Sequence, residues 1–419
     1  MSEMNLTHRA LAAGLLACAA LFSSSVTAAE SLSMWVRASG ANAAQRLTDL
    51  WNTGHADKIA LTVIPDNQVV SKLATGVKAG DVPDLVSFDL IYMPDFMRAG
   101  LLTDITDSMK ADPNFGKVAK AFSDLATYKG RMFGTGFTPD VSIIIYNKDL
   151  FRKAGLDPNK PPTTWEELQA VAQKATLKNA QGQVTSWGLT IPDDIWLAMC
   201  FIYQNGGRVS SADFKKAYLG EKATIEAVQF WTDLANKYKV MPRHRTFPIS
   251  VQDFAAGNTA MLIHSTGNLR FVSDSAKFEW GTAFLPTHKK QAVAIGGAGF
   301  YIFKKASKEK QEAAWQFIKF ATSAEMQARW NIGSGYIATR KSSFELPIMK
   351  EYTAKLPQAL VARDQIPYAL PEMSTHDNWK MRNIFVTTFQ EILDEKYTPE
   401  EGMKKAQAEI EKVLAPFQK

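Results

Sequence analysis

The side chains of this sequence that could do chemistry are aromatic rings and planar polar groups close to apolar runs. The 419 residues include 10 Trp and 11 Tyr. Asp140 follows Pro139 and comes just before the apolar run at 142–146. A carboxylate accepts two hydroxyl hydrogen bonds and an aromatic face packs against C–H groups, which together could hold a sugar ring, whereas a carboxylate repels phosphate. The alternative for Asp140 is a loop cap, because Asp favours turns.

Three further polar or aromatic residues stand at the ends of predicted strands. Trp35 and Arg37 end the apolar run at 31–37, and Asp89 ends the run at 84–89. In open parallel sheets, the carboxyl ends of the strands line the ligand crevice. The three residues are therefore candidates for ligand binding. Because position alone supports this, a structural role is an equal alternative for each.

Catalytic motifs are weak or missing in the sequence. The stretch at 263–267 resembles a G-x-S-x-G nucleophile elbow around Ser265, but it has Ile263 where the first glycine is required. H-E-x-x-H, a phosphate loop and a dinucleotide fingerprint are missing, and the histidines are isolated, which disfavours a zinc site. Asp89 and Asp140 could form a glycosidase pair, although two acids are a common occurrence. We therefore expect no catalytic residue, no metal and no cofactor.

The elements that must position these residues alternate between strands and helices. Apolar runs at 31–37, 59–64 and 84–89 are each followed by a helical pattern. Such alternation predicts an α/β fold with a parallel sheet covered on both faces. Thr164 and Glu167 form a capping box, which predicts a helix from Trp165. From there to about residue 248 the sequence pattern is mainly helical.

Length, composition and the N-terminus limit the class of protein. A chain of 419 residues exceeds one hydrophobic core, so two lobes are expected. Residues 1–29 read as a signal peptide cleaved near Ala28 or Ala29, which predicts export to the periplasm; Cys18 is the less favoured alternative, as a lipid-attachment site. Cys200 is then the one remaining cysteine, expected as a buried thiol. The net charge of +6 comes with interspersed acids, so no nucleic-acid binding is expected.

Several stretches, in order along the chain, resemble extracellular solute-binding proteins of family 1, the periplasmic carbohydrate-binding proteins of ABC importers that include maltose-type binders and the glycerol-3-phosphate binder. The matching stretches are 146–156, 162–168, 257–261, 295–297, 313–317, 334–337 and 397–401. This resemblance implies a two-lobe periplasmic-binding-protein (Venus-flytrap) fold, with parallel-sheet lobes joined by several crossing segments. It also implies an N-terminal lobe of 30–140 plus 266–322 and a C-terminal lobe of 141–265 plus 323–419.

The resemblance also implies where ligand is held. Family members often place a ligand-facing tryptophan at a helix start, which is the position of Trp196; the alternative is a core Trp packed on Met199 and Cys200. The glycerol-3-phosphate binder carries a ligand-contacting serine at the position of Asp140 and an aromatic residue near the second helix, where this chain has Gln68 or Val69. Its other ligand-contacting positions fall on Ser265, Gly297, Tyr336 and Arg382. Gly297 could instead form an ordinary turn, and Arg382 could be a surface residue.

The function implied by the resemblance is that of the substrate-binding component of an ABC importer. It would capture a small-molecule carbohydrate, either a mono- or oligosaccharide or a polyol, as a monomer. It would deliver the ligand to membrane permease subunits served by a cytoplasmic ATPase. The alternatives are a glycerol-3-phosphate or glycerophosphodiester binder of the same family and, less favoured, a secreted glycoside hydrolase.

Overall fold

The structure is a computed structural model that describes residues 31–65, 68–112 and 123–418. The predicted signal peptide, including Cys18, lies outside the described residues. In these three ranges, no helix is both long and apolar enough to cross a membrane. Cys200 is a buried free thiol, as predicted, and burial raises its pKa to about 12.

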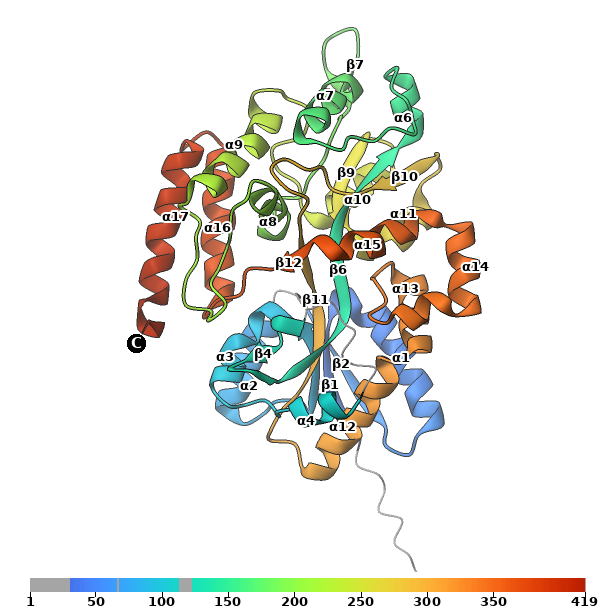
Figure 1. Ribbon diagram of the computed structural model, residues 1–419, viewed down its shortest axis with the longest axis vertical. Coiled ribbons are helices and arrows are strands. Elements are labelled where there is room, and N and C mark those ends of the chain that lie inside the picture. The colour runs from blue at the N-terminus through green and yellow to red at the C-terminus, as the bar shows by residue number, and fades with distance from the viewer. Residues whose placement is uncertain (1–30, 66–67, 113–122, 419) are drawn as a thin grey trace, which may run out of the picture.

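Three parallel strands form one half of the protein, the lower half in Figure 1. The central strand β1 (Leu32–Arg37) pairs with β2 (Ile59–Ile64) on one side and β3 (Leu85–Asp89) on the other. Helices α1 (Ala41–Gly54) and α2 (Val69–Ala79) connect them, each burying one apolar face. The predicted alternation of strand and helix is confirmed here, and β1 and β3 end at Arg37 and Asp89.

Two long antiparallel strands run through both halves (Figure 1). They are β6 (Gly134–Asn147), buried along its whole length, and β11 (Val293–Ile302). In the lower half β11 pairs with β3, while in the upper half β6 pairs with β9 (Met261–Ser265) and β10 (Trp280–Ala283), all antiparallel. The sheet is thus mixed rather than wholly parallel, because β6 and β11 cross between the halves in opposite directions.

The upper half is mostly helical. Helix α7 (Trp165–Ala175) begins where predicted, and the Thr164 side chain accepts a hydrogen bond from the Glu167 amide. Helices α8 (Ile195–Gln204) and α9 (Lys222–Asn236) pack with two C-terminal helices, α16 (Asn378–Leu393) and α17 (Pro399–Leu414). Helix α8 is buried on all sides, which explains its continuous apolar sequence.

Further elements complete the described parts of the two halves. The remaining helices are α3 (Pro94–Arg98), α4 (Thr106–Ala111), α6 (Lys148–Lys153), α10 (Phe247–Ala255), α11 (Leu269–Ser275), α12 (Lys308–Ala321), α13 (Ala324–Ser334), α14 (Pro347–Lys355) and α15 (Leu360–Gln365). The remaining strands are β4 (Thr127–Tyr128), β5 (Arg131–Met132), β7 (Leu177–Lys178), β8 (Val184–Ser186) and β12 (Ala369–Pro371). Short 3-10 turns include η3 (Leu90–Tyr92) and η5 (Thr266–Asn268).

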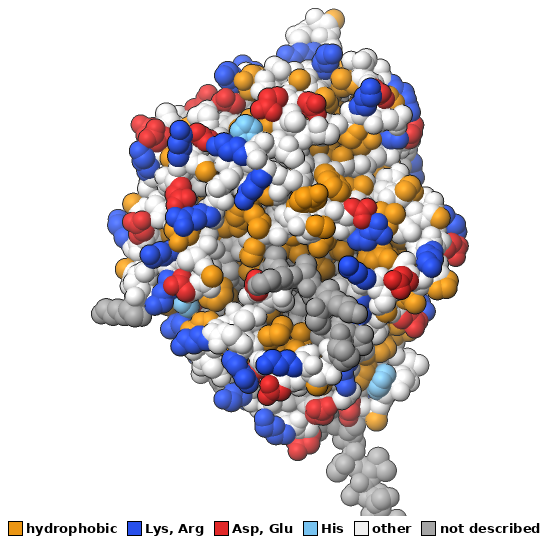
Figure 2. Space-filling view, in the orientation of Figure 1, with side chains coloured by type: hydrophobic (Ala, Val, Ile, Leu, Met, Phe, Trp, Pro, Cys, Tyr) orange, Lys and Arg blue, Asp and Glu red, His pale blue; other side chains and the backbone are white. Residues whose placement is uncertain are grey.

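Separate apolar contacts stabilise the two halves. In the lower half, the Phe137 ring packs against Phe300 and Trp330, with ring centroids 4.4 and 4.5 Å apart. In the upper half, Trp231 packs against Phe201 and Phe389. The face drawn in Figure 2 carries Lys and Arg side chains interspersed with Asp and Glu. The expected lobe limits stay a prediction.

Candidate functional site

Asp140 lies in the stretch of β6 that passes between the two halves. Its carboxylate accepts hydrogen bonds from the hydroxyl of Ser265, from the amide of Thr266 at 3.1 Å and from the hydroxyl of Thr266 at 2.7 Å. Burial raises the pKa of Asp140 to about 6, and these hydrogen bonds oppose the rise. Asp140 and Ser265 therefore hold the start of η5 in place. This is the loop-capping role that the sequence left open, and ligand contact by either residue stays a prediction.

Arg37, Asp89 and Tyr336 form a second group beside Asp140. The Arg37 guanidinium lies 2.7 Å from the Asp89 carboxylate and also donates a hydrogen bond to the Tyr336 hydroxyl. Burial raises the pKa of Tyr336 to about 12. The Tyr336 ring covers Gly267, where an added Cβ would lie 2.7 Å from the ring. The structure thus brings together two predicted strand-end residues and one residue predicted from the resemblance.

Trp196 lies in the first turn of α8, as predicted. The Asp194 carboxylate caps this helix by accepting from the Trp196 amide at 2.7 Å. The Trp196 side chain lies against Gly296, where an added Cβ would be 3.0 Å from its Nε1. That Nε1 is buried and finds no hydrogen-bond acceptor among the residues that the structure describes. A buried donor without an acceptor is costly, and ligand contact by Trp196 stays a prediction.

Arg382 is a buried residue rather than the surface residue considered above. Its guanidinium forms an ion pair with the Glu372 carboxylate and lies 3.4 Å from Asp194. Burial raises the pKa of Glu372 to about 7, while the charge of Arg382 opposes the rise. The negative charge of Glu372 holds the pKa of Arg382 above its usual range, against the effect of burial. The guanidinium is therefore charged and already neutralised by protein carboxylates.

Tyr92, at the end of η3, links these groups across the two halves. Burial raises its pKa, and the charges of Arg382, Asp89 and Glu372 all act on its hydroxyl. We call the whole assembly the interlobe cluster; its members are Arg37, Asp89, Tyr92, Asp140, Asp194, Trp196, Ser265, Tyr336, Glu372 and Arg382. It contains four carboxylates and two guanidinium groups, so its charge is negative when all of them are ionised.

Two predicted site residues have structural roles outside the interlobe cluster. Gly297 has φ +122° in β11, and an added Cβ would lie 2.0 Å from the Thr138 carbonyl oxygen, so close strand packing requires glycine there. Trp35 is buried in the core, with the Lys72 ammonium 4.7 Å from its ring centroid. Ligand binding by either residue stays a prediction.

Sequence reasoning missed Tyr92, Asp194 and Glu372. Asp194 carried a readable signal, because an Asp immediately before an apolar helical run is a typical N-cap. Glu372 and Tyr92 stand between apolar neighbours, where the sequence offers no pattern. Among the described residues, no group of three or more His, Cys, Asp or Glu could hold a metal ion.

Two α/β halves that share crossing strands, with a polar cluster between them, define the class of two-lobe ligand-binding proteins. The profile of bacterial extracellular solute-binding proteins matches residues 51–358, and the chain belongs to this family. The resemblance and the two-lobe fold predicted from the sequence are thereby confirmed. Members of the family bind small molecules and work with the permease components of ABC importers.

Proteins with a named ligand are similar to this chain in sequence or in fold. The sn-glycerol-3-phosphate-binding periplasmic protein UgpB of Yersinia enterocolitica is 26% identical over 341 residues, which are 76% of each chain. A solute-binding protein of Thermotoga lettingae bound with alpha-D-tagatose is 24% identical, with a TM-score of 0.80 over 92% of this chain and 100% of its own. UgpB of Mycobacterium tuberculosis in complex with glycerophosphocholine is 23% identical, with a TM-score of 0.80 over 93% of this chain and 99% of its own.

Proposed function

We propose that this chain captures a neutral sugar or polyol between its lobes and delivers it to the permease subunits of an ABC importer. The observation that carries the proposal is the interlobe cluster. It sets the Trp196 ring, with its free N–H, beside buried carboxylates and guanidinium groups. An aromatic face with planar polar groups around it matches the C–H faces and hydroxyl edges of a sugar.

The charges of the cluster favour a neutral ligand over a phosphate. Both guanidinium groups already face carboxylates, Arg37 at Asp89 and Arg382 at Glu372. A phosphate would have to displace these partners and would then lie beside unpaired buried carboxylates, at a cost of several kcal/mol. Sugar hydroxyls, in contrast, donate to carboxylates without displacing the guanidinium groups.

Ligand capture would follow from closure of the lobes about β6 and β11. Arg37, Asp89 and Tyr92 come from the lower half, whereas Trp196 and Glu372 come from the upper half. A ligand that touches both groups gains contacts only when the lobes are closed, so binding shifts the population toward the closed state. For the lobe limits we keep 30–140 plus 266–322 and 141–265 plus 323–419 as a proposal. The pairing of β10 with β6 favours moving residues 280–283 to the second lobe, and the packing of Trp330 on Phe137 favours moving α13 to the first.

A glycerol phosphate or glycerophosphodiester is the second candidate ligand. It is favoured by the ligands of the two UgpB relatives, sn-glycerol 3-phosphate and glycerophosphocholine, together with the position of a buried arginine in the cluster. We further propose that the chain acts as a monomer in the periplasm after loss of residues 1–29, without lipid at Cys18. The periplasmic location of relatives supports this proposal.

Titration of the exported chain, residues 30–419, tests the proposal. Hexoses, disaccharides, polyols and glycerol 3-phosphate are each added while tryptophan emission is followed, and the ligand is then recovered for mass spectrometry. A saturable response to a neutral sugar or polyol, with the ligand recovered unchanged, is expected. Ligand conversion would instead indicate an enzyme, and a response to glycerol 3-phosphate alone would favour the second candidate. Phe271→Ala, which removes an exposed ring on α11, serves as the control variant.

A further inference from the structure

A histidine of the upper half lies between two carboxylates that come from distant parts of the chain. His244 Nδ1 lies 3.0 Å from the Asp193 carboxylate, and His244 Nε2 lies 3.0 Å from the Asp394 carboxylate. A neutral imidazole has a single N–H donor, whereas the imidazolium donates from both nitrogens. Both contacts are therefore hydrogen bonds only when His244 is protonated, and the positive ring then lies between two negative groups.

Asp193 depends on this histidine because it is buried. Its side chain is 5% exposed, and its Oδ1 has no hydrogen-bond partner among the described residues. Its amide donates to the Arg245 carbonyl at 2.8 Å, which holds the loop before α8 against the loop before α10. Burial raises the pKa of Asp193, and the hydrogen bond from His244 opposes the rise. Because a buried carboxylate without its charged partner is strongly destabilised, the position of this loop depends on His244.

The two loops joined by His244 also position Trp196. Asp194, the next residue of the first loop, caps α8 by accepting from the Trp196 amide at 2.7 Å. The second loop leads into Phe247 at the start of α10, and the Phe247 ring stacks on the Trp196 ring with centroids 6.4 Å apart. The Trp196 side chain is thus supported from both loops.

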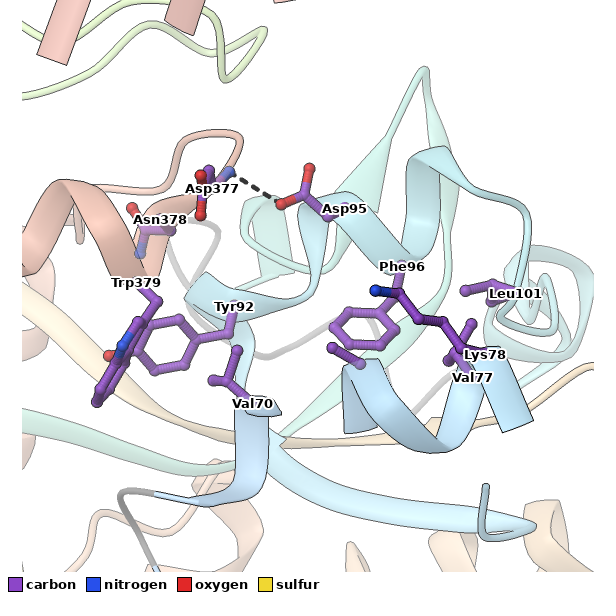
Figure 3. A pocket seen from close by; sticks show the side chains of 11 residues that line it. Val70, Val77, Lys78, Tyr92, Asp95, Phe96, Leu101, Asp377, Asn378 and Trp379 are labelled. Atoms are coloured by element: carbon purple, nitrogen blue, oxygen red, sulfur yellow. Dashed lines mark hydrogen bonds between the residues drawn. The ribbon is translucent and has the colours of Figure 1, made fainter. Parts of the chain in front are cut away.

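Helix α16, which carries Arg382 in its second turn, is held at both ends. At its start, the Asp377 amide donates to the Asp95 carboxylate at 2.9 Å across the seam between the halves, drawn as a dashed line in Figure 3. At its end, Asp394 is the C-cap residue and faces His244. A positive charge is also favourable at the C-terminus of a helix. The protonated ring therefore fixes the far end of the helix that carries Arg382.

The charges around His244 favour its protonated form. Burial acts to lower the pKa of His244, but the hydrogen bonds to Asp394 and Asp193 and their charges raise it above its ordinary value. The ring thus stays protonated to a higher pH than a free histidine does. Further charged groups surround it: the Arg243–Glu395 pair at 2.7 Å, the Arg245–Asp253 pair at 3.0 Å, and Lys396, which acts on Asp394. Since histidine is the side chain whose ordinary pKa lies closest to neutral pH, His244 is the member of this set expected to change its charge there.

We infer that His244 is a positioning residue for the ligand site, whose protonated ring holds the loop before α8, the loop before α10 and the end of α16 together. Trp196 and Arg382 then keep the geometry that a ligand needs. Loss of the proton leaves a donor for only one of the two carboxylates and removes the positive charge beside buried Asp193. Ligand affinity should therefore fall as pH rises above neutral. This inference rests on the proposed function and adds its regulation by pH.

Calorimetry on residues 30–419 at pH 6, 7, 8 and 9 tests this inference. Glucose, galactose, maltose and sorbitol are the probes, and the one that binds most tightly is used throughout. His244→Gln does not titrate and has no charge to share between the carboxylates. Wild type should bind the probe about fivefold more tightly than this variant at pH 6 and equally at pH 9. Asp140 and Glu372 titrate in both proteins, so their effect cancels in the ratio. His288→Gln, which removes a half-buried histidine that stacks on a different tryptophan, is the control and should match wild type at every pH.

Two further measurements show whether the proton itself matters. By reciprocity, a ligand that binds the protonated form better must raise the proton affinity of His244 by the same factor of about five. An NMR titration of His244, assigned by the loss of its resonance in His244→Gln, should show this increase when the probe is bound. Asp394→Asn removes one negative partner and keeps an acceptor, so the fall in affinity should move to lower pH.

The outcomes separate the role of His244 from the function on which it depends. If the probe binds but the affinity ratio between wild type and His244→Gln is the same at every pH, the inference is refuted and the proposed function stands. An NMR titration that the probe leaves unchanged refutes it as well. If His244→Gln melts below the temperature of the assay, the wild-type NMR titration and Asp394→Asn decide. If no probe binds at any pH, the proposed function fails and the inference fails with it.

Discussion

Replacing Asp140 by Asn tests how the crossing strand β6 is held between the lobes. The Asn oxygen can still accept from the amide and hydroxyl of Thr266, and the Asn amide can donate to Ser265. Asn therefore imitates the protonated form of Asp140 without being able to ionise. The comparison isolates the effect of the negative charge in this buried position.

The magnitude follows from the pKa of Asp140, which burial raises from 3.8 to about 6 in the folded protein. Since the folded state binds this proton more tightly than the unfolded state, the stability contributed is fully present below pH 3.8 and is lost as pH rises through 6. Two pKa units correspond to about 3 kcal/mol in total. Between pH 4.5 and 7.5 the loss amounts to about 2 kcal/mol.

Urea unfolding at pH 4.5, 5.5, 6.5 and 7.5, followed by tryptophan emission, measures this loss. The difference in unfolding free energy between wild type and Asp140→Asn cancels the other titrating groups. Relative to wild type, we expect the unfolding free energy of the variant to rise by about 2 kcal/mol between pH 4.5 and pH 7.5. If the unfolding free energies of the two proteins change with pH in the same way, burial does not destabilise the ionised form of Asp140. A variant less stable by several kcal/mol at every pH would show that the charged hydrogen bonds dominate instead.

Three further substitutions test other parts of the structure. Trp196→Ala should weaken ligand binding about tenfold or more in the fluorescence or calorimetric titration, since one aromatic contact is lost. An unchanged affinity would show that Trp196 packs in the core and does not contact the ligand. Glu372→Gln should remove one negative partner of Arg382 and let glycerol 3-phosphate bind at least about tenfold more tightly than to wild type, and no gain would refute the charge argument. Gly297→Ala should lower stability by about 3 kcal/mol or more in urea unfolding, because its Cβ would meet Thr138 at 2.0 Å; a stability equal to wild type would contradict the packing at this strand crossing.

Local features of the fold could be predicted because their causes lie within a few residues. Thr164 caps α7 through an amide three residues away, and the alternation of apolar runs and helical patterns gave β1, α1, β2, α2 and β3. The end of β1 at Arg37 and of β3 at Asp89 likewise follows from the sequence. Because adjacent parallel strands end at the same edge, these two side chains meet at 2.7 Å.

The composition of the interlobe cluster could not be predicted in the same way. Arg382 and Asp194 are 188 positions apart, and Asp140 finds its donors 125 and 126 positions away. Such pairs depend on tertiary packing between elements that are far apart in the chain. Glu372 shows the difficulty, since a single Glu between Pro371 and Met373 does not reveal that it will be buried against a guanidinium.

Contacts that lie away from the interlobe cluster also join the two halves and would assist the proposed closure of the lobes. His376 Nδ1 meets the Asp95 carboxylate at 2.9 Å, and the Arg98 guanidinium lies 4.9 Å from the Phe417 ring centroid, each pair joining the two halves. Contacts of this kind contribute about 1 kcal/mol each, while open and closed states of such proteins differ by only a few kcal/mol. A ligand therefore has to supply only a small difference in affinity between the states. It follows that weakening the seam would lower ligand affinity without any change in the groups that touch the ligand, because part of the binding free energy would then be spent on closing the lobes.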